Sequence, residues 1–368
     1  MMRVIYKDRG SIINILLILI GLYFFLFSIA LLSVSFSEAN QEKAESILLI
    51  TTNPFISLFV GLLVTAIVQS SSTTTSLIVA LVASGSISLQ QAIPMMMGAN
   101  IGTTITSAIV SLSFITQKKA FRKAVSAGVI HDIFNILITF IFFPLEYYYG
   151  FLSGLTQWLT NLINPVKPAG IDGFAFDMLY THQLAELVLN AINHPFISIV
   201  IAFLILFGSI KLLSKLLFRL LRGEFEDKFR KQLDNPLTAL TWGTILTAAV
   251  QSSSITTSLV VPVVATNKLS VKKAFPFIMG ANVGTTITAF LAAINKSDAA
   301  VSIAIAHFLF NILGVIIIFP FPTIRQIPVK IAKMMGRLTY KNRLVGFIYI
   351  FIAFFLIPFL LIYFSRNN

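Results

Sequence analysis

Long apolar runs alternate with short polar segments along this 368-residue chain, and the lengths of those runs predict its elements. A membrane-spanning helix needs about 20 apolar residues, and runs of that kind predict spans at 11–34, 89–112, 121–144, 194–221, 271–294, 298–319 and 344–364. Two more apolar stretches are interrupted by Gln-Ser-Ser-Ser, after the helical arms Phe55–Val68 and Leu237–Val250. We predict that these two stretches enter the membrane and return as re-entrant hairpins. The pattern indicates an all-α polytopic membrane protein.

The interrupted stretches are two copies of one sequence. Thr65–Ala80 and Thr247–Pro262 are identical at 12 of 16 positions and lie 182 residues apart. Each follows an Asn-Pro pair, and each precedes the pattern Pro-x-x-Met-Gly-Ala-Asn-x-Gly-Thr-Thr-Ile-Thr, at Pro94–Thr106 and Pro276–Thr288. Duplicated, broken apolar segments are typical of secondary transporters.

The duplication predicts how the chain is divided. Each repeat holds a span, a hairpin, a broken span and a final span, and three crossings are an odd number, so the second repeat is expected to have inverted topology. This arrangement would bring the hairpin tips together near the membrane midplane and suits an elevator-type transporter. The expected parts are repeat 1 at 1–144, an external connection at 145–193, repeat 2 at 194–322, a cytoplasmic amphipathic segment at 323–343 and an additional span at 344–368. Gly223–Leu233 and Thr323–Asn342 are expected to be amphipathic helices on the membrane surface.

Charge and composition set the orientation and exclude several classes. The net charge is +13, and 23 of the 27 Lys and Arg residues fall on the amino-terminal side of the predicted spans. The positive-inside rule then predicts a multi-pass protein of the inner, cytoplasmic membrane with a cytoplasmic amino terminus. This sorting by side assigns the basic excess to topology and lipid contact and not to nucleic acid. Because there is no cysteine, disulfides and thiol chemistry are excluded.

The hairpin tips carry the first candidate chemistry. At each tip the returning helix would present unpaired N–H groups and the positive end of its dipole, which favour an anion. Serines 70–72 and 252–254 add uncharged donors, and the free carbonyls of the approach arms suit Na⁺. The alternative is that these serines and threonines are only small packing residues.

The predicted broken spans carry the second candidate chemistry. Gly98–Gly102 and Gly280–Gly284 each enclose an asparagine, Asn100 or Asn282, and are followed by threonines. Glycine would let the helix unwind and free carbonyls for ions, and the amides offer an acceptor for a cation and a donor for an anion. Close helix packing through a Gly-x-x-x-Gly face would fit the same spacing.

Three polar residue types in the final spans complete the set. Asp132 is the one acidic residue in the interior of a predicted span, since Asp298 stands at the first position of its span, and a carboxylate there marks a functional site, for a cation or for a proton. His131 and Asn135 match His307 and Asn311 in the second repeat, and a spacing of four places each pair on one helix face. We favour polar contacts between helices over ligand binding for these pairs.

Taken together, these motifs resemble the type II sodium–phosphate cotransporter family. The resemblance is carried by the paired QSSS and GAN-x-GTT motifs, by Ile130–Asn135 and by His307–Pro320, and covers about 50–145 and 235–325. It implies sodium-driven import of inorganic phosphate, and Asp at position 132 implies an electrogenic cycle with an extra sodium. The implied phosphate ligands are Ser70, Ser71, Ser72, Asn100, Ser252, Ser253, Ser254 and Asn282. The implied sodium ligands are Gln69, Thr73, Thr74, Thr103, Thr104, Asp132, Asn135, Gln251, Thr256, Thr285 and Thr286.

The chain also departs from the family pattern. Gln117 stands where vertebrate members have an acidic residue, so one sodium contact differs, and the disulfide of their connecting loop is impossible here. The sequence shows no PhoU-like domain of the kind appended to many bacterial relatives. A short, cysteine-free core points to a bacterial member.

The expected function is therefore a sodium-coupled phosphate symporter that works by alternating access and is not an enzyme. Its partners would be inorganic phosphate, Na⁺ as the coupling ion and membrane lipid, with a homodimer as a candidate assembly, no further cofactor and no nucleic acid. A sodium symporter for sulfate or a dicarboxylate remains an alternative, because neutral donors hold all these anions. An intramembrane serine hydrolase is disfavoured, since no G-x-S-x-G turn is present. A channel would not need duplicated hairpins.

Overall fold

The computed structural model describes residues 2–51, 53–163, 181–221, 233–294 and 296–365, and every regular element within them is a helix. The helices before the predicted connection are α1 (Met2–Thr51), α2 (Pro54–Val68), α3 (Ser71–Ala83), α4 (Leu89–Gly102), α5 (Ile105–Leu112) and α6 (Lys118–Tyr149). The connection holds α7 (Phe151–Ile163) and α8 (Thr181–Ile192). The following helices are α9 (Pro195–Leu221), α11 (Pro236–Val250), α12 (Ser253–Ser258), α13 (Val260–Ala265), α14 (Val271–Thr285), α15 (Ile287–Ala293) and α16 (Asp298–Ile318). The last are α17 (Pro322–Lys341), α18 (Leu344–Phe351), the π-helical turn η3 (Ile352–Leu356) and α19 (Ile357–Ser365).

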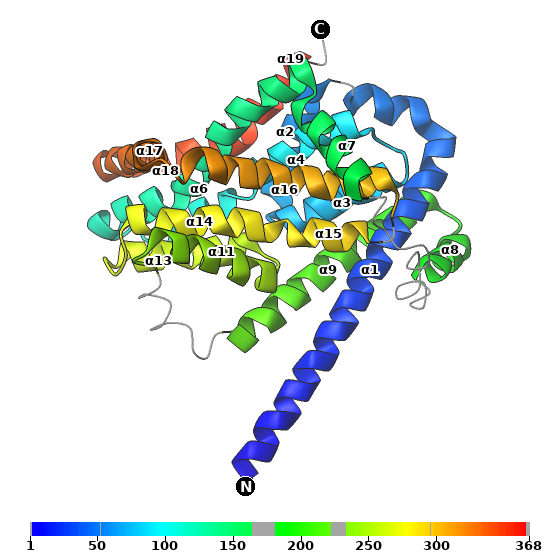
Figure 1. The fold of residues 1–368 in the computed structure, drawn as a ribbon, viewed down its shortest axis with the longest axis horizontal. Coiled ribbons are helices and arrows are strands. Elements are labelled where there is room, and N and C mark those ends of the chain that lie inside the picture. The colour runs from blue at the N-terminus through cyan, green and yellow to red at the C-terminus, as the bar shows by residue number, and fades with distance from the viewer. Residues whose placement is uncertain (1, 52, 164–180, 222–232, 295, 366–368) are drawn as a thin grey trace.

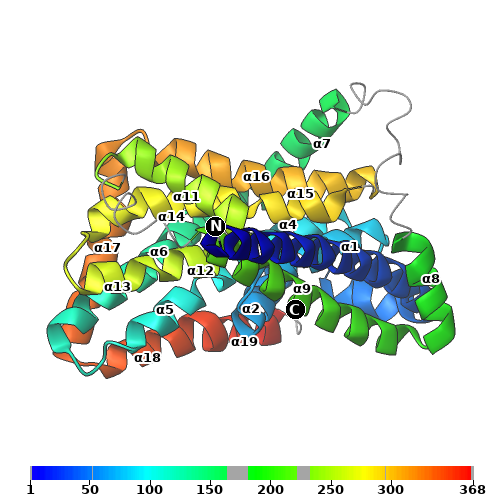
Figure 2. The ribbon, with the colours of Figure 1, turned by 90° about the horizontal axis from the view of Figure 1, so that it is seen from below.

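Helices from the two repeats pack in matching pairs. α2 lies against α4, and the corresponding α11 lies against α14. α1 of the first repeat runs beside α9 of the second, and α17, which follows the repeats, lies beside α6. In Figures 1 and 2 the long helices α6, α14 and α16 run along the length of the molecule, with α8 at one end and α13 and α17 at the other. The two repeats therefore share one helical body.

Among the described residues, seven helical segments are long and apolar enough to cross a bilayer, and they agree with the seven predicted spans. These segments are Leu16–Ala39, Leu89–Leu112, Lys118–Tyr149, Pro195–Leu213, Val271–Ala293, Asp298–Ile318 and Leu344–Phe364. The four hairpin arms are shorter, at Pro54–Val68, Ser71–Ala83, Pro236–Val250 and Ser253–Ala265. The predicted all-α class is thus confirmed, and the segments support a multi-pass membrane protein.

The end of the third span differs from the sequence prediction. The third span is longer than expected, so it also contains Glu146, a buried carboxylate near its end. That side chain accepts the backbone N–H groups of Leu152 and Ser153 at 2.8 and 3.0 Å, so it caps the start of α7. Asp132 is therefore not the only acid in a span.

The two predicted surface helices have different outcomes. The predicted helix at Gly223–Leu233 lies outside the described residues except for its last residue. The predicted helix at Thr323–Asn342 is observed as α17. α17 buries Val329, Ala332 and Gly336 and packs on α6, so one of its faces is covered by protein.

Glycines allow a close approach of the backbones in the two corresponding helix pairs, α2–α4 and α11–α14. A Cβ at Gly98 of α4 would lie 1.8 Å from the carbonyl oxygen of Leu58 in α2, and one at Gly280 of α14 would lie 1.9 Å from that of Leu240 in α11. Gly61 and Gly243 on the opposing helices meet Met95 and Phe277 in the same way, at 1.9 and 2.0 Å. The helix backbones touch, as small residues allow between membrane helices.

This contact corrects the expectation that the helices unwind at their glycines. α4 runs unbroken to Gly102 and α14 to Thr285. The interruptions come directly afterwards, at Thr103–Thr104 and at Thr286. The missing Cβ is used for packing against the neighbouring backbone, and the break falls on the threonines.

The returning arms of the two hairpins differ. α3 is continuous over Ser71–Ala83, whereas the matching arm is divided into α12 and α13 around Leu259. Pro262 stands where the first repeat has Ala80. Because proline has no N–H to donate to the carbonyl four residues earlier, it accounts for this interruption.

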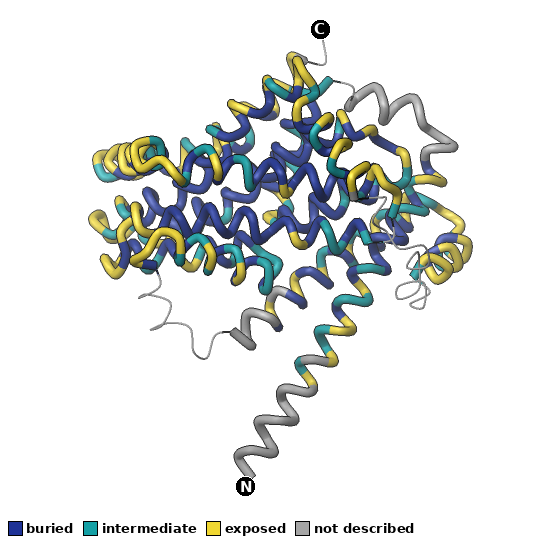
Figure 3. The backbone as a smooth tube through the Cα atoms, in the orientation of Figure 1, coloured by how far each residue is buried: buried dark blue, intermediate teal, exposed yellow. Residues whose placement is uncertain are grey.

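The interior of the protein is polar as well as apolar. Figure 3 shows buried residues through the middle of the helical body and exposed residues at its ends. Every residue from Ser71 to Ser76 in α3 is buried, although all six carry hydroxyls. Large apolar side chains face outward instead, including Phe140, which is 79% exposed. This pattern is expected of a protein whose surroundings are lipid and whose function lies inside.

The glycine contacts predict a selective loss of stability. We expect Gly98→Ala or Gly280→Ala to lower the melting temperature in detergent, because the methyl group would force the paired helices apart at a cost of about 1–3 kcal/mol. Gly208→Ala in α9 is the matched control, since no atom lies within 4 Å of its added Cβ. Equal melting temperatures for Gly98→Ala and Gly208→Ala would show that the close approach does not matter.

Candidate functional site

The two QSSS motifs fold into the same turn. Gln69 and Gln251 end α2 and α11 in the left-handed region, with φ of 57° and 56°. Ser70 and Ser252 follow with φ of −148°, and their hydroxyls accept the N–H groups of Thr73 and Ile255 at 3.2 and 3.3 Å. A serine at the N-cap satisfies one of the free donors of the next helix. Sequence identity in the repeats is therefore matched by identity of backbone conformation.

The two turns lie against each other. Ser72 Oγ donates to the backbone oxygen of Gln251 at 2.8 Å, and it lies 3.4 Å from the hydroxyl of Thr288 in α15. A second contact joins Ser107 of α5 to Thr257 of α12, with their hydroxyl oxygens 3.0 Å apart. Hydroxyl-rich segments that are more than 100 residues apart in sequence thus form one buried polar region.

A chain of amides and imidazoles crosses between the repeats. His131 Nε2 is hydrogen-bonded to Asn282 Oδ1, and Asn282 Nδ2 donates to Asn135 Oδ1. Asn135 Nδ2 donates to the backbone oxygen of Asn100 at 2.6 Å. In the reverse direction, His307 Nε2 lies 3.2 Å from Asn100 Oδ1. Each final span therefore holds the asparagine of the other repeat's broken helix.

In this conformation the side chains of the asparagines and histidines are engaged in hydrogen bonds within the protein. Asn100 Nδ2 donates to the backbone oxygen of Met96 at 3.1 Å, so both ends of its amide have protein partners, as do those of Asn282. The contacts fit the favoured interpretation of the histidines as polar links between helices. Direct phosphate binding by the two amides would require these bonds to exchange.

Asp132 lies at the junction of a broken span and the last span. Its side chain is fully buried, Thr104 Oγ1 donates to Oδ1 at 3.0 Å, and the Tyr349 hydroxyl of α18 donates to Oδ2. Among the described residues no basic side chain pairs with it. Each carboxylate oxygen has more than one lone pair, so acceptor capacity is left for a cation.

Several buried polar atoms have no hydrogen-bond partner, and they recur at matching positions of the two repeats. The matched pairs are Thr65 Oγ1 and Thr247 Oγ1, Ser76 Oγ and Ser258 Oγ, and His131 Nδ1 and His307 Nδ1. Ser253 Oγ, Thr285 Oγ1 and Gln251 Oε1 are also unpartnered. Because a buried polar group without a partner costs about 1–3 kcal/mol, such atoms point to an ion, a ligand or water.

The remaining predicted hydroxyls bond within their own turns. Thr73 pairs with Ser70, and the hydroxyls of Thr74, Thr103, Thr256 and Thr286 donate to carbonyls three or four residues earlier. With their protons engaged, their oxygen lone pairs face outward as acceptors. Ser71 and Ser254 are buried, whereas Gln69 is exposed.

Thr65 and Thr247 were not predicted, yet they lie directly beside the breaks. Added Cβ atoms at Gly102 and Gly284 would lie 2.7 and 3.0 Å from their Cβ atoms. Both threonines stand at matching positions in the 16-residue repeat, so the duplication itself carried a signal for them. Tyr349 carried none, because it lies in the last span, which has no counterpart in the duplication.

The donor set determines which ions the region suits. Hydroxyl, carbonyl and carboxylate oxygens are ligands for hard cations, whereas transition metals favour imidazole and thiolate. In the part of the chain that the structure describes, no three His, Cys, Asp or Glu side chains come together. The hydroxyl donors of the touching turns suit a small oxyanion.

Comparisons with known proteins agree with this chemistry. Residues 24–147 and 204–354 match the family described as Na+/Pi-cotransporter. The sodium-dependent phosphate transport protein 2A of Rattus norvegicus is 32% identical, over 95% of this chain and 67% of the relative, and that of Ovis aries is 31% identical over the same shares. Protein 2B of Homo sapiens is 28% identical over 93% of this chain and 64% of its own. No solved structure matches. The chain belongs to the Na+/Pi-cotransporter family.

Proposed function

We propose that this protein is a sodium-coupled symporter that imports inorganic phosphate by alternating access. The observation that carries the proposal is the contact between the two QSSS turns, through Ser72 Oγ and the Gln251 carbonyl, within a buried region rich in unpartnered hydroxyls. The named relatives are sodium-dependent phosphate transport proteins, which supports the same substrate and ion.

Phosphate would bind where the two turns meet. The serines of both tips supply uncharged donors, and Ser253 Oγ is buried without a partner, so it is free to donate to an oxyanion. Asn100 and Asn282, implied as phosphate ligands, would join them when the histidine contacts exchange. A site without Lys or Arg binds the anion without holding it so tightly that release becomes slow.

Sodium would bind first, beside the breaks. Thr247 and Thr285 in the second repeat offer unpartnered hydroxyl oxygens next to Gly284, and Asp132 offers acceptor capacity in the first. Without a cation, these oxygens and the tip carbonyls would repel a phosphate dianion. With sodium bound, the same groups become a neutralised site.

The transport cycle would use the duplicated architecture. We infer that the repeats have inverted topology, and that the hairpins and broken spans move together against a scaffold that includes α1 and α9, which pack on each other. Each net positive charge that moves inward contributes about 2.3 kcal/mol per 100 mV. A tenfold sodium gradient adds about 1.4 kcal/mol per ion. The cycle would be electrogenic through Asp132, in a cytoplasmic membrane with the amino terminus inside.

Purified protein in liposomes tests the function directly. We expect uptake of radiolabelled phosphate that requires an inward sodium gradient and does not occur with potassium. Excess unlabelled sulfate or succinate should leave the uptake unchanged. Equal uptake in potassium would contradict sodium coupling, and full competition by sulfate would favour the broader oxyanion alternative.

A serine substitution tests the phosphate site. Ser253→Ala should raise the phosphate KM at least about tenfold, since a hydrogen bond to a charged ligand contributes roughly 1.5–3 kcal/mol, and should leave the melting temperature unchanged. Ser198→Ala in α9 is the matched control, because its hydroxyl is also buried and unpartnered. Equal KM values in the two variants would remove Ser253 from the site.

A second substitution tests the charge movement. Asp132→Asn keeps the shape of the side chain, so phosphate uptake should stay sodium-dependent while the phosphate-evoked current disappears. Glu146→Gln, which changes the other buried carboxylate of α6, should retain the current. Undiminished current in Asp132→Asn would reject the assignment of an extra sodium ion to this residue.

A further inference from the structure

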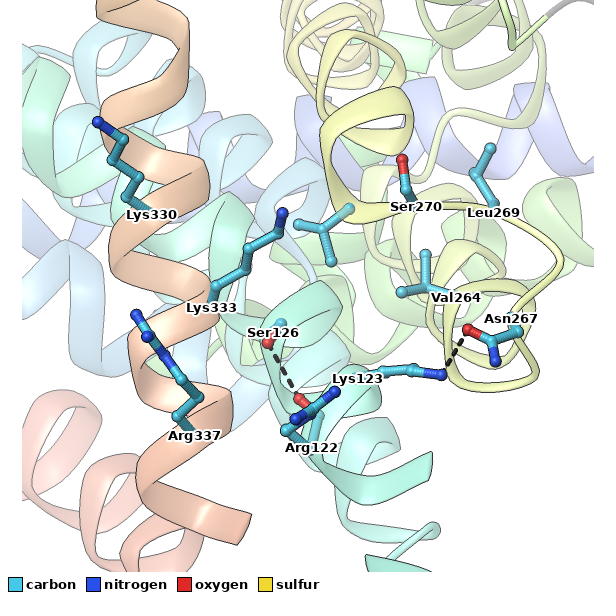
Figure 4. Close-up of a pocket in the computed structure, with 11 residues that line it drawn as sticks. Arg122, Lys123, Ser126, Val264, Asn267, Leu269, Ser270, Lys330, Lys333 and Arg337 are labelled. Atoms are coloured by element: carbon cyan, nitrogen blue, oxygen red, sulfur yellow. Dashed lines mark hydrogen bonds between the residues drawn. The ribbon is translucent and has the colours of Figure 1, made fainter. Parts of the chain in front are cut away.

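A cavity lies at the end of the molecule that carries α13 and α17 (Figures 1 and 4), and none of the residues that line it belongs to the QSSS turns. It has a volume of about 460 Å³, is open on one side, and is lined by residues of α6, α17, the start of α14 and the turn between α13 and α14. Five of the residues that line it are basic, and they define what we call the basic cavity: Arg122, Lys123, Lys330, Lys333 and Arg337. None of the described residues that line it is acidic.

No carboxylate in the described part of the chain neutralises the charges of the basic cavity. Among the described residues no carboxylate pairs with any of the five, and the nearby Asp234 is engaged by Lys273 at 2.7 Å. Lys123 Nζ donates to the uncharged side chain of Asn267. The Arg122 guanidinium lies over the Tyr340 ring, 5.6 Å from its centroid. Clustered cations with no described counter-charge attract an anion.

The fold holds these cations together through one close contact. An added Cβ at Gly336 of α17 would lie 2.1 Å from Ser126 Oγ and 2.3 Å from the backbone oxygen of Arg122, both in α6. α17 therefore touches α6 at Gly336, and Lys333 and Arg337 stand on either side of that point in sequence. In Figure 4, Lys333 and the two basic side chains of α6 extend into the space between α17 and the α13–α14 turn.

The start of α14 adds to the same field. Ser270 caps this 15-residue helix by accepting the N–H of Lys273 at 3.3 Å, and Ser270 and Val271 line the cavity. The first N–H groups of a helix and its dipole favour an anion. Guanidinium and ammonium groups on two helices and a helix start on a third thus surround one space.

We propose that the basic cavity binds a phosphate group, either inorganic phosphate or the headgroup of an anionic phospholipid. Arginine matches phosphate oxygens with paired donors and lysine adds charge. A volume of about 460 Å³ is in the range of pockets for small molecules, so there is room for a group attached to the phosphate. Its segments, 118–123, 268–273 and 325–343, belong to the side that the charge bias places in the cytoplasm.

A bound phosphate group would connect the α13–α14 turn with α6 and α17 through charge-assisted hydrogen bonds. α13 ends the returning arm of the second hairpin, whereas α6 carries His131 and Asp132. The ligand would bridge the α13–α14 turn to α6 and α17 and stabilise their association. The cavity shares no residue with the QSSS turns, so it goes beyond the proposed transport site.

Binding to the full-length protein in neutral detergent and sodium-free buffer tests the site. The probes are inorganic phosphate, dihexanoyl phosphatidylglycerol and, as the zwitterionic comparison, dihexanoyl phosphatidylcholine, each titrated against the melting temperature. The test variant combines K330Q, K333Q and R337Q. The control variant combines R325Q, K341Q and R343Q, which removes the same charge from α17 and its end but from outside the cavity.

We expect an anionic probe to raise the melting temperature of the parent and control proteins and to bind the test variant at least about tenfold more weakly, since charge-assisted bonds are lost. Stabilisation by phosphatidylglycerol but not by phosphatidylcholine identifies a lipid headgroup, and stabilisation by inorganic phosphate identifies the free ion. The single variants Lys333→Gln and Lys341→Gln repeat the comparison with a smaller change, in case the triple variants fold poorly.

Three results would overturn the site. One is that neither anionic probe stabilises the parent protein. Another is that the test and control variants weaken binding equally, which would indicate a general effect of charge. The last is a phosphate response that Ser253→Ala abolishes and the test variant retains, because that response would belong to the transport site.

Discussion

The contact of helix backbones through glycine is the constraint on which the rest of the structure depends. Gly98 and Gly280 bring α4 and α14 against the carbonyls of Leu58 and Leu240. The approach arm of each hairpin, α2 or α11, is thereby packed tightly on its broken helix. That pairing sets where the QSSS turn ends and where the threonine break begins. Because any side chain larger than hydrogen would separate the backbones, the geometry of the polar region follows from these glycines.

Hydrogen bonds between the repeats then convert two similar halves into one site. His131 contacts Asn282 and His307 contacts Asn100, so each half completes the other. In surroundings without water, an unpaired amide is costly, and exchanging partners between halves satisfies these groups, while Ser253 Oγ at the second tip stays without a partner. Through the same hydrogen bonds, a conformational change at the hairpin tips would also shift both final spans.

The two regions that we propose for phosphate binding use opposite chemistry. The buried region between the QSSS turns has only uncharged donors and one carboxylate, since a charged side chain inside the membrane is expensive. The basic cavity lies at one end of the molecule, and four of its five basic residues are exposed, so their charges cost little. Uncharged donors suit a substrate that must leave again, whereas clustered charge suits a ligand that stays.

The sequence by itself determined the class, the span positions and the family, because the length of apolar runs and a near-identical duplication can be read along the chain without tertiary information. The sequence also identified the tip serines, Asp132 and the His–Asn pairs as candidates, because polar residues within apolar runs are easily recognised. Only the tertiary structure decided their partners. It showed that the glycines pack and do not unwind, and that Tyr349 reaches Asp132 from a span outside the repeat. It also gathered five cations from α6 and α17 around one cavity. Such contacts join residues far apart in the chain, and packing alone fixes which of them meet.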